Sequence, residues 1–362
     1  MELPKKKESR WGLLYYFQLF TNFNSTMRKL ATIQIVSDVH PIEGADKIEL
    51  ASILGWKVVI KKGEFEPGDP AIYCEVDSLL PVKPEFEFLR KSSFKRMSDG
   101  KEGFRLKTIK LRGQISQGLL LPITALGAHV IDLVPGTDVT DLLEIVKYEP
   151  PIPAKLAGEV KGPFPGFLSK TDEERVQNLV EELSQYENSF FYVTEKVDGT
   201  SITIYLKDGQ FGICSRNLEL VENPENTYWK VVRELDIENK LRNLGRNIAL
   251  QGELLGEGIQ KNIYKFKGQT IKFFDAFDID SYRYFDRKSF FEIISDFGLE
   301  TVPVVFDDFT LPESIDEILQ LANGKSQLNP EANREGLVFR TTDDKRFSFK
   351  AISNNFLLLE EE

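Results

Sequence analysis

The stretch that decides the fold of this chain is FFYVTEKVDGTSITIYLKDGQFGICSRN, residues 190–217. Its apolar and β-branched residues predict three short strands. The dipeptide Asp208-Gly209, between the second and third strands, is typical of a two-residue hairpin turn. This hairpin returns Arg216 to the loop that carries Lys196 and Asp198. We therefore expect a lysine, a carboxylate and an arginine in one place.

That combination suits attack on a phosphorus atom. A lysine amine becomes a nucleophile when nearby cations or a dry pocket lower its pKa. Arginine and a metal ion would offset the charge on phosphate groups. Both histidines, His40 and His129, lie in the first half, so a site in the second half must use lysine, arginine and carboxylates. The alternative is an ordinary surface Lys-x-Asp-Gly turn, because the motif alone is short.

Further short motifs follow in a fixed order. They are Ser215-Arg216-Asn217, Gly252-Glu253-Leu254-Leu255-Gly256, FFDAFDI at 273–279, Arg334-Glu335-Gly336-Leu337-Val338 and Phe349-Lys350-Ala351-Ile352-Ser353. Together with the motif at Lys196, this ordered set resembles the collinear motifs of the covalent nucleotidyltransferases. That superfamily contains DNA ligases, RNA ligases and mRNA capping enzymes. The longer stretches EKVDGTS (195–201) and GELLGEGIQKNIY (252–264) are similar to the RNA-ligase branch.

The resemblance implies a role for each residue at a matching position. Lys196 would be the nucleophile that becomes lysyl-AMP. The nucleotide would be held by Glu195 at the adenine edge, Phe277 and Val338 on the adenine faces, Arg216 on a phosphate or the ribose, Glu253 on a ribose hydroxyl and Lys350 on the α-phosphate. Asp198, Glu253 and Glu335 would hold Mg²⁺ or Mn²⁺ and its waters. Lys350 would also help to depress the pKa of Lys196.

Each of these residues also has an ordinary explanation. Phe277 could be core, Arg216 a hairpin-end charge, and Glu253 or Glu335 a solvated carboxylate. The order of the whole set favours the functional interpretation. The last motif departs from the family, because many members have Lys-x-Lys where this chain has Ser348-Phe349-Lys350. The nearby cations that could replace the missing lysine are Lys345 and Arg346.

Upstream of the catalytic motifs, residues 27–148 predict a small all-β domain. Short strand-like segments alternate there with turn signals, which suggests a barrel or sandwich. The segments HPIEGADKIE (40–49) and LRGQISQGL (111–119) resemble the OB-fold of tRNA-binding modules. Only 12 residues follow Lys350, too few for another domain. An OB domain ahead of the catalytic domain resembles one branch of RNA ligases, which joins a 3′-OH end to a 5′-phosphate end.

We therefore expect an α+β protein with an N-terminal OB-fold barrel and a nucleotidyltransferase domain of antiparallel sheets with flanking helices. The expected boundaries are an extension at 1–26, the OB domain at 27–148, a Pro/Gly-rich linker at 149–166 and the catalytic domain at 167–362. Helices are predicted at 171–186, with a Thr171–Glu174 capping box, and at 226–244, 287–297 and 313–323.

Charge is distributed unevenly along the chain. The net charge of −11 argues against non-specific binding of nucleic acid. Residues 90–112 nevertheless carry nine basic side chains and two acidic ones. OB barrels bind nucleic-acid backbone in basic grooves, so we expect RNA contacts in this segment. The expected contact residues are Arg105, Lys107, Lys110 and Arg112. The alternative is a solvated loop and edge strand.

Other features bear on location. The two cysteines, Cys74 and Cys214, form no disulfide framework and fit a reducing compartment. No apolar run is long enough to span a membrane. The apolar stretch WGLLYYFQLF (11–20) follows three lysines, and we interpret it as part of a poorly structured extension, with a transit peptide as the alternative. We expect an intracellular monomer, cytoplasmic or nuclear, or organellar if the extension is a transit peptide.

These observations predict an ATP-dependent RNA ligase acting on RNA ends through lysyl-AMP and RNA-adenylate intermediates. A DNA or broad-specificity ligase would use the same site, and a guanylyl-transferring capping enzyme is a further alternative. A non-catalytic RNA-binding protein that retains the ligase fold is the alternative from another class.

Overall fold

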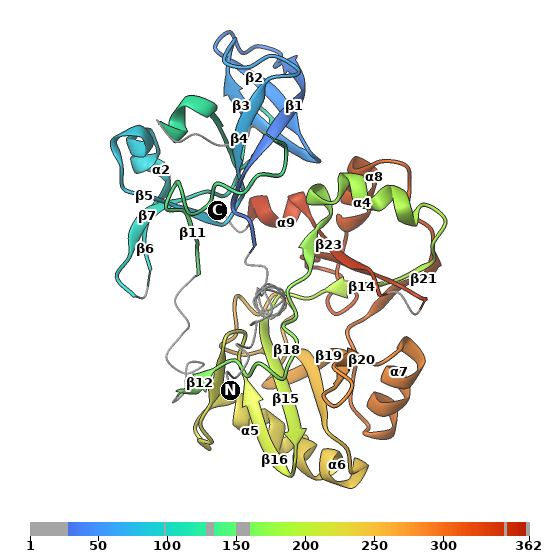
Figure 1. Ribbon diagram of the computed structural model, residues 1–362. Helices are drawn as coiled ribbons and strands as arrows, with labels where there is room; N and C mark the ends of the chain where they lie inside the picture. The colour runs from blue at the N-terminus through green and yellow to red at the C-terminus, as the bar shows by residue number, and fades with distance from the viewer. Residues whose placement is uncertain (1–27, 98, 128–133, 150–159, 344–345, 360–362) are drawn as a thin grey trace, which may run out of the picture.

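The computed structural model describes residues 28–97, 99–127, 134–149, 160–343 and 346–359 (Figure 1). The expected extension at 1–26 and residues 150–159 of the expected linker lie outside this range. No helix in the described ranges is long and apolar enough to cross a membrane.

The first domain, at the top of Figure 1, is built from two antiparallel sheets. One has the order β10-β4-β1-β2-β3 and comprises Leu119–Pro122, Pro70–Cys74, Ala31–Pro41, Ile48–Ile53 and Trp56–Lys61. The other has the order β11-β5-β7-β6 and comprises Val146–Lys147, Ser78–Pro81, Glu102–Arg105 and Phe94–Arg96. Large buried side chains, Trp56, Tyr73, Phe86 and Phe104, fill the interior. The all-β prediction for this domain is confirmed.

A separate hairpin of β8 (Thr108–Leu111) and β9 (Gln114–Gln117) projects from this domain. Its turn residues Arg112 and Gly113 have φ values of 48° and 83°, as a two-residue hairpin turn requires. The strand-like run of residues 104–111 in the sequence is therefore not one strand. Its two halves, β7 and β8, belong to different sheets.

The second domain contains two larger sheets. The seven-stranded sheet has the order β12-β17-β16-β15-β18-β19-β20, with bounds Val160–Pro163, Leu218–Leu220, Gln210–Cys214, Thr200–Lys207, Ile248–Gly256, Gln269–Asp278 and Arg283–Tyr284. The five-stranded sheet has the order β13-β23-β22-β14-β21, with bounds Glu174–Arg175, Ser348–Ile352, Gly336–Thr341, Phe191–Lys196 and Val304–Phe309. All pairings are antiparallel except that of β13 with β23.

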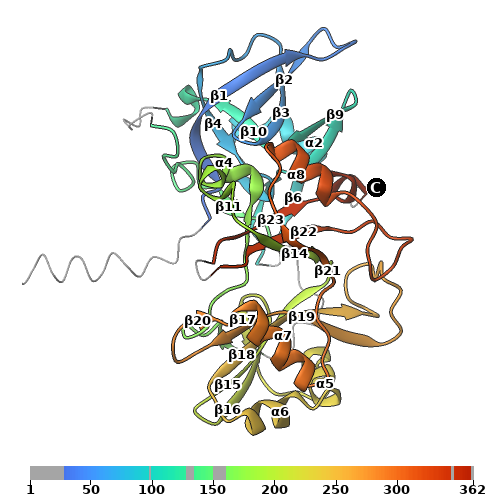
Figure 2. The same cartoon turned by 90° about the vertical axis from the view of Figure 1, so that its right-hand side faces the viewer.

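Helices cover one face of each large sheet. The seven-stranded sheet packs on α5 (Thr227–Glu234), α6 (Ile237–Leu244) and α7 (Arg287–Asp296), at the bottom of Figures 1 and 2. The five-stranded sheet packs on α8 (Ile315–Ala322). The last helix, α9 (Asn354–Leu359), contacts β8 of the first domain. The opposite faces of the two sheets remain available for a site between them.

Three of the four predicted helices are confirmed in outline. The helix expected at 226–244 is two helices, α5 and α6, because Asp236 adopts φ 52° between them. It ends at Gly245 as predicted, with φ 68°. The last of the three, α8, begins with a capping box formed by Ser314 and Glu317.

The helix expected at 171–186 is wrong. Residues 174–175 form β13, and a 3-10 turn (Val176–Asn178) precedes the short α4 (Val180–Leu183) and a second 3-10 turn (Ser184–Tyr186). The side chain of Glu174, which a capping box would use to bond Thr171, accepts instead from Arg175 N and Asn178 Nδ2. Tertiary pairing of β13 with β23 outweighs the local helical pattern.

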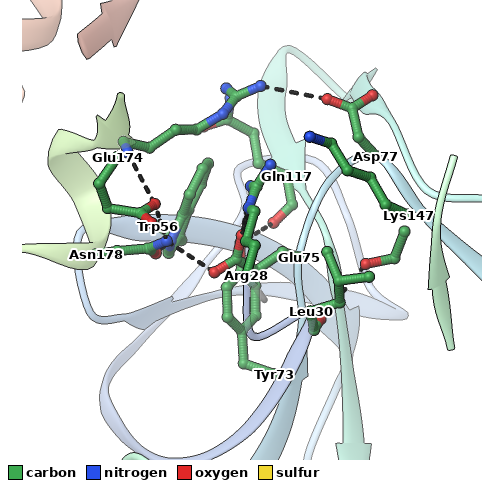
Figure 3. A network of polar contacts seen from close by, with 12 residues as sticks. Arg28, Leu30, Trp56, Tyr73, Glu75, Asp77, Gln117, Lys147, Glu174 and Asn178 are labelled. Atoms are coloured by element: carbon green, nitrogen blue, oxygen red, sulfur yellow. Dashed lines mark hydrogen bonds and ion pairs between the residues drawn. The ribbon is translucent and has the colours of Figure 1, made fainter. Parts of the chain in front are cut away.

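A polar network joins the two domains (Figure 3). Trp56 Nε1 donates to Asn178 Oδ1 at 2.7 Å, and Asn178 Nδ2 donates to Glu75 Oε1 at 2.7 Å. On its other side Glu75 accepts from Arg28 Nε at 2.8 Å. Burial raises the pKa of Glu75, although the charge of Arg28 opposes that shift. Hydrogen bonds that link Trp56, Asn178 and Glu75 thus attach the first domain to residues 174–178.

At Gly55 the backbones of the two domains approach each other closely. The N–H of Gly55 donates to the carbonyl of Gln177 at 2.9 Å. A Cβ at this position would lie 2.8 Å from the Cα of Gln177 and 3.0 Å from Ile315 Cδ1, so a side chain would force the backbones apart.

We expect Gly55→Val to lower the free energy of unfolding by about 1–3 kcal/mol, the usual cost of overpacking. Thermal unfolding of the full chain measures this. Gly166→Val is the matched control, because a Cβ there meets nothing within 4 Å. Equal melting temperatures for the two variants would show that the contact between the domains adjusts to a side chain at position 55 with little loss of stability.

Candidate active site

A cavity of about 620 Å³ lies between the two large sheets and reaches the end of the first domain. Strand ends and loops of both sheets line it, and Tyr148 and Glu149 of the first domain close one side. Its volume is in the range of sites that hold a cofactor-sized molecule. The predicted site residues that line it are Glu195, Lys196, Asp198, Arg216, Glu253, Glu335, Val338 and Lys350.

Strand alternation explains how the five-stranded sheet presents these side chains. In β22 and β23, Leu337, Phe339 and Phe349 pack toward α8. The alternate residues Val338 and Lys350, which are cross-strand partners, face the cavity. The seven-stranded sheet behaves likewise, since Ser201 and Glu253 are opposite each other in β15 and β18 and both line the cavity.

Lys196 stands at the end of β14 and is 28% exposed. Its Nζ donates to Glu335 Oε1 at 2.6 Å. Burial lowers the pKa of Lys196, but the carboxylates of Glu335, Glu253 and Asp198 outweigh burial and raise it above its ordinary value. The net direction of the pKa shift of Lys196 is thus opposite to the depression that Lys350 was expected to favour.

The depressed lysine is Lys350 itself. Burial, followed by the charges of Arg175 and Lys196, lowers the pKa of Lys350 to about 7. Arg175 is its partner in the parallel pairing of β13 with β23. This end of the cavity therefore carries an excess of cationic groups, and an anion bound there would restore the charge of Lys350.

The carboxylates of Glu253, Glu335 and Asp198 act on one another and on Lys196. Burial, together with the negative charges of Glu335 and Asp198, raises the pKa of Glu253 to about 8, although Lys196 opposes the shift. Such a donor set fits a divalent cation, which would favour the charged form of Glu253. Within the residues that the structure describes, no group of three His, Cys, Asp or Glu side chains could hold a metal ion by itself. A cation at these carboxylates would need oxygens from water or a substrate phosphate as well, as is common for Mg²⁺.

Arg216 is held by a residue that the sequence analysis missed. Its Nη2 donates to Asp172 Oδ1 at 2.6 Å, and Lys147 of the first domain approaches the other oxygen at 3.8 Å. Burial raises the pKa of Asp172, but Arg216, Lys147 and Lys350 outweigh it and lower the pKa. The failed helix prediction at 171–186 hid Asp172, which lies in an extended segment along the cavity.

Phe277 does not line the cavity, and its predicted contact with the adenine is wrong. It is 1% exposed and lies 5.1 Å from the ring of Tyr284, in a separate cluster. A bulge in β19 explains the error. Gln251 faces Asp275 and Gly252 faces Phe273, so Phe274 is the extra residue. It is Phe274 that enters the cavity, near Val338 and Val302.

Ser348 occupies the position of the missing lysine in the last motif, and its neighbour across the sheet is a different cation. Ser348 Oγ donates to Glu173 Oε2 at 2.6 Å. Opposite Ser348 in the sheet stands Arg340, which is 3% exposed, lines the cavity and donates to Thr194 Oγ1 at 3.2 Å. Arg340 also lies 3.5 Å from carboxylate oxygens of Glu173 and Asp275. Arg346 pairs with the same Asp275 outside this cavity, and Lys345 lies outside the described residues. Arg340 shares its strand face with Val338, which is the signal that could have found it.

The expected RNA-binding residues do not act as one group. Arg105 donates to Asp77 Oδ1 at 2.9 Å and covers the ring of Tyr148 at 4.6 Å. Lys110 and Arg112 are exposed on the β8–β9 hairpin, and Lys107 is half-buried just before it. Arg105 therefore supports the cavity wall, and the hairpin carries the accessible charge.

Comparison with known proteins agrees with this geometry. The family model for RNA ligases matches residues 189–352, and a model for an OB-fold domain matches residues 30–123. No curated protein matches the chain. A solved apo variant of Naegleria gruberi RNA ligase is 43% identical, with a TM-score of 0.85 over 91% of this chain and 97% of that one.

Related structures of the same ligase carry ligands. A variant with ATP and Mn is 43% identical and one with AMP and Mn is 44% identical. Both have a TM-score of 0.84, and both alignments cover 91% of this chain and 98% of the other. Identity of this extent over nearly the whole of both chains, on a cavity built from the predicted motif residues, shows that this protein belongs to the RNA ligase family.

Proposed function

We propose that the chain is an ATP-dependent RNA ligase that joins a 3′-OH end to a 5′-phosphate end. The observation that carries the proposal is the cavity around Lys196, which is lined by the carboxylates of Asp198, Glu253 and Glu335 and by the cations of Lys350, Arg340 and Arg216. The solved Naegleria ligase structures with ATP and Mn support ATP as the AMP donor.

The first step is attack of Lys196 Nζ on the α-phosphorus of ATP. The N–P bond forms, the bond from the α-phosphorus to the bridging oxygen breaks, and pyrophosphate leaves. The amine must first lose a proton, and Glu335 is the carboxylate that accepts its hydrogen bond. Lys350, Arg340 and Arg216 offset the charge on the phosphates. The adenine fits between Phe274 and Val338, with Glu195 at its edge.

Two further displacements complete the reaction. The RNA 5′-phosphate takes AMP from Lys196 and forms a 5′-5′ anhydride. The RNA 3′-OH then attacks the 5′-phosphorus of this anhydride, releases AMP and seals the strand. A divalent cation held by Asp198, Glu253 and Glu335 would neutralise phosphate charge in these in-line displacements.

A joining assay with matched RNA and DNA ends tests the proposal. With ATP and Mg²⁺ or Mn²⁺ we expect labelling of the protein by α-labelled ATP, and sealing of RNA. Both should stop in excess chelator. Faster sealing of DNA would favour the broad-specificity alternative. If the protein shows neither labelling nor sealing, the alternative of a non-catalytic RNA-binding protein is favoured.

We also propose that the β8–β9 hairpin contacts the RNA backbone. Neutralising Lys107, Lys110 and Arg112 should weaken RNA binding and reduce its dependence on salt, since each phosphate contact releases counterions. The slope of log affinity against log salt should fall by up to about three units. Lysyl-AMP formation should change little, because these residues do not line the cavity.

RNA affinity at several salt concentrations, measured beside the rate of lysyl-AMP formation, separates these effects. The control variant is Lys57→Ala, Lys61→Ala, Lys62→Ala, which removes three charges from β3 and the residue after it, beside the hairpin but outside it. If both triple variants weaken binding equally, the hairpin has no special role.

The cellular setting remains a proposal. Cys74 and Cys214 are buried and free, which fits an intracellular, reducing location. We propose that the protein acts there as a monomer, in the cytoplasm or nucleus, or in an organelle if residues 1–26 are a transit peptide. Size-exclusion chromatography with light scattering tests the oligomeric state.

A further inference from the structure

The loop between β18 and β19, residues 256–268, contacts the catalytic loop, residues 197–199. It contains three non-glycine residues with left-handed backbone, namely Gln260 at φ 45°, Asn262 at φ 42° and Lys265 at φ 58°. Such conformations are unfavourable for these residues and persist where the surrounding structure fixes them. The loop is therefore held in one shape at a local energetic cost.

Internal contacts close this loop on itself. At its neck, Glu257 N donates to the carbonyl of Gly268 at 2.9 Å. At its tip, Asn262 Nδ2 donates to the carbonyl of Phe266 at 3.0 Å, and Phe266 N donates back to Asn262 Oδ1 at 3.2 Å. The loop can thus act as a rigid support.

Two side chains of the loop bind the backbone beside the nucleophile. The hydroxyl of Tyr264 accepts from Asp198 N at 2.6 Å, and Gln260 Nε2 donates to the carbonyl of Gly199 at 3.0 Å. The ring of Tyr264 is 5% exposed and packs with Val197. The chain that follows Lys196 is therefore fixed by a donor, an acceptor and an apolar contact.

The same loop is tied to the part of the site that holds Glu195. Asn329 Nδ2 donates to the carbonyl of Ile263 at 2.8 Å. Two residues earlier, Gln327 N donates to Glu195 Oε2 at 2.8 Å. The loop that carries Tyr264 is therefore connected to residues 327–329, and this segment also bonds Glu195, which is expected to contact the adenine edge.

We propose that Tyr264 is a positioning residue for the reaction of Lys196, through its hydroxyl and not only its ring. Without the hydroxyl, the half-buried backbone N–H of Asp198 loses the acceptor that Tyr264 provides, and the loop shifts. Small displacements of a nucleophile reduce its rate steeply, because the attack must be in line. This inference rests on the proposed function, since it concerns the attack of Lys196 on ATP.

Tyr264→Phe tests the proposal by removing one oxygen atom and keeping the ring. At saturating ATP we expect single-turnover lysyl-AMP formation to slow about tenfold, the factor that corresponds to one lost hydrogen bond. The ATP concentration for half-maximal rate should stay within about twofold, because Tyr264 is not among the residues that line the cavity. Sealing of pre-adenylylated RNA should slow less, because Lys196 does not attack in that step.

The matched control is Tyr205→Phe. Tyr205 is also buried, and its hydroxyl donates to Glu219 away from the cavity. Tyr264→Phe should melt at the temperature of this control but react more slowly; equal rates would overturn the proposal. If Tyr264→Phe melts below the control, the two rates are compared at a temperature at which both variants are folded, and equal rates there would overturn the proposal. Absence of lysyl-AMP in the unaltered protein would refute the proposed function instead.

Discussion

We expect Lys196→Ala to abolish labelling of the protein by α-labelled ATP while the chain remains folded. No other amine can replace Nζ at the end of β14, because the nearest cavity lysine, Lys350, lies on a different strand pair. The fold persists because the backbone pairing of Lys196 with Gly336 does not depend on the side chain. The measurement is a denaturing gel after incubation with ATP and a divalent cation.

Lys207→Ala serves as the control, since it removes a lysine from β15 of the same domain and leaves the cavity intact. It should be labelled as fully as the unaltered chain. Acid-labile label retained in Lys196→Ala would show that another group carries the AMP.

Phe274→Ala and Phe277→Ala should have opposite consequences. Phe277 is fully buried, so its truncation should lower the free energy of unfolding by about 3–5 kcal/mol and leave the affinity for ATP unchanged below the melting temperature. Phe274 is half-buried and faces the cavity, so its truncation should cost less stability. Loss of one aromatic face from the base should weaken ATP binding by about 0.5–1.5 kcal/mol.

Thermal melts and equilibrium binding of ATP to both variants test this pair, and each variant is the control for the other. If Phe277→Ala loses ATP affinity at a temperature where it is folded, the β19 bulge has been assigned to the wrong residue. The same result in both assays for Phe274→Ala and Phe277→Ala would also contradict the assignment.

The catalytic residues could be predicted because each one belongs to a short local pattern. Lys196 ends a strand, Asp208-Gly209 fixes the next hairpin, and Glu335 precedes a buried strand. The predicted turn at Asp208-Gly209 is confirmed, because Lys207 pairs with Gln210, although the ladder ends at Thr203 and Cys214. Local patterns of this kind can be recognised in the sequence because the structures they specify depend on few long-range contacts.

The errors arose where distant segments decide the outcome. The bulge at Phe274 depends on the pairing of β18 with β19, and counting by twos along one strand cannot reveal it. The strand at Glu174 exists because β23 pairs with it from 175 residues away. Arg105 appeared to be a surface charge, yet Asp77 and Tyr148 hold it beside the cavity. Sign and spacing of charges alone cannot distinguish a supporting arginine from an accessible one.

The contact at Gly55 has a consequence for how such ligases can be recombined. The turn that carries Gly55 touches residues 174–178, whose first two residues pair with Phe349 and Lys350. A chimera that takes its first domain from another ligase would therefore inherit half of an interface that reaches the phosphate end of the cavity. Residues 174–178 belong to the transplanted unit even though they lie beyond the linker. We expect exchange to succeed when the crossover is placed after Asn178 and to fail when it is placed within residues 149–166.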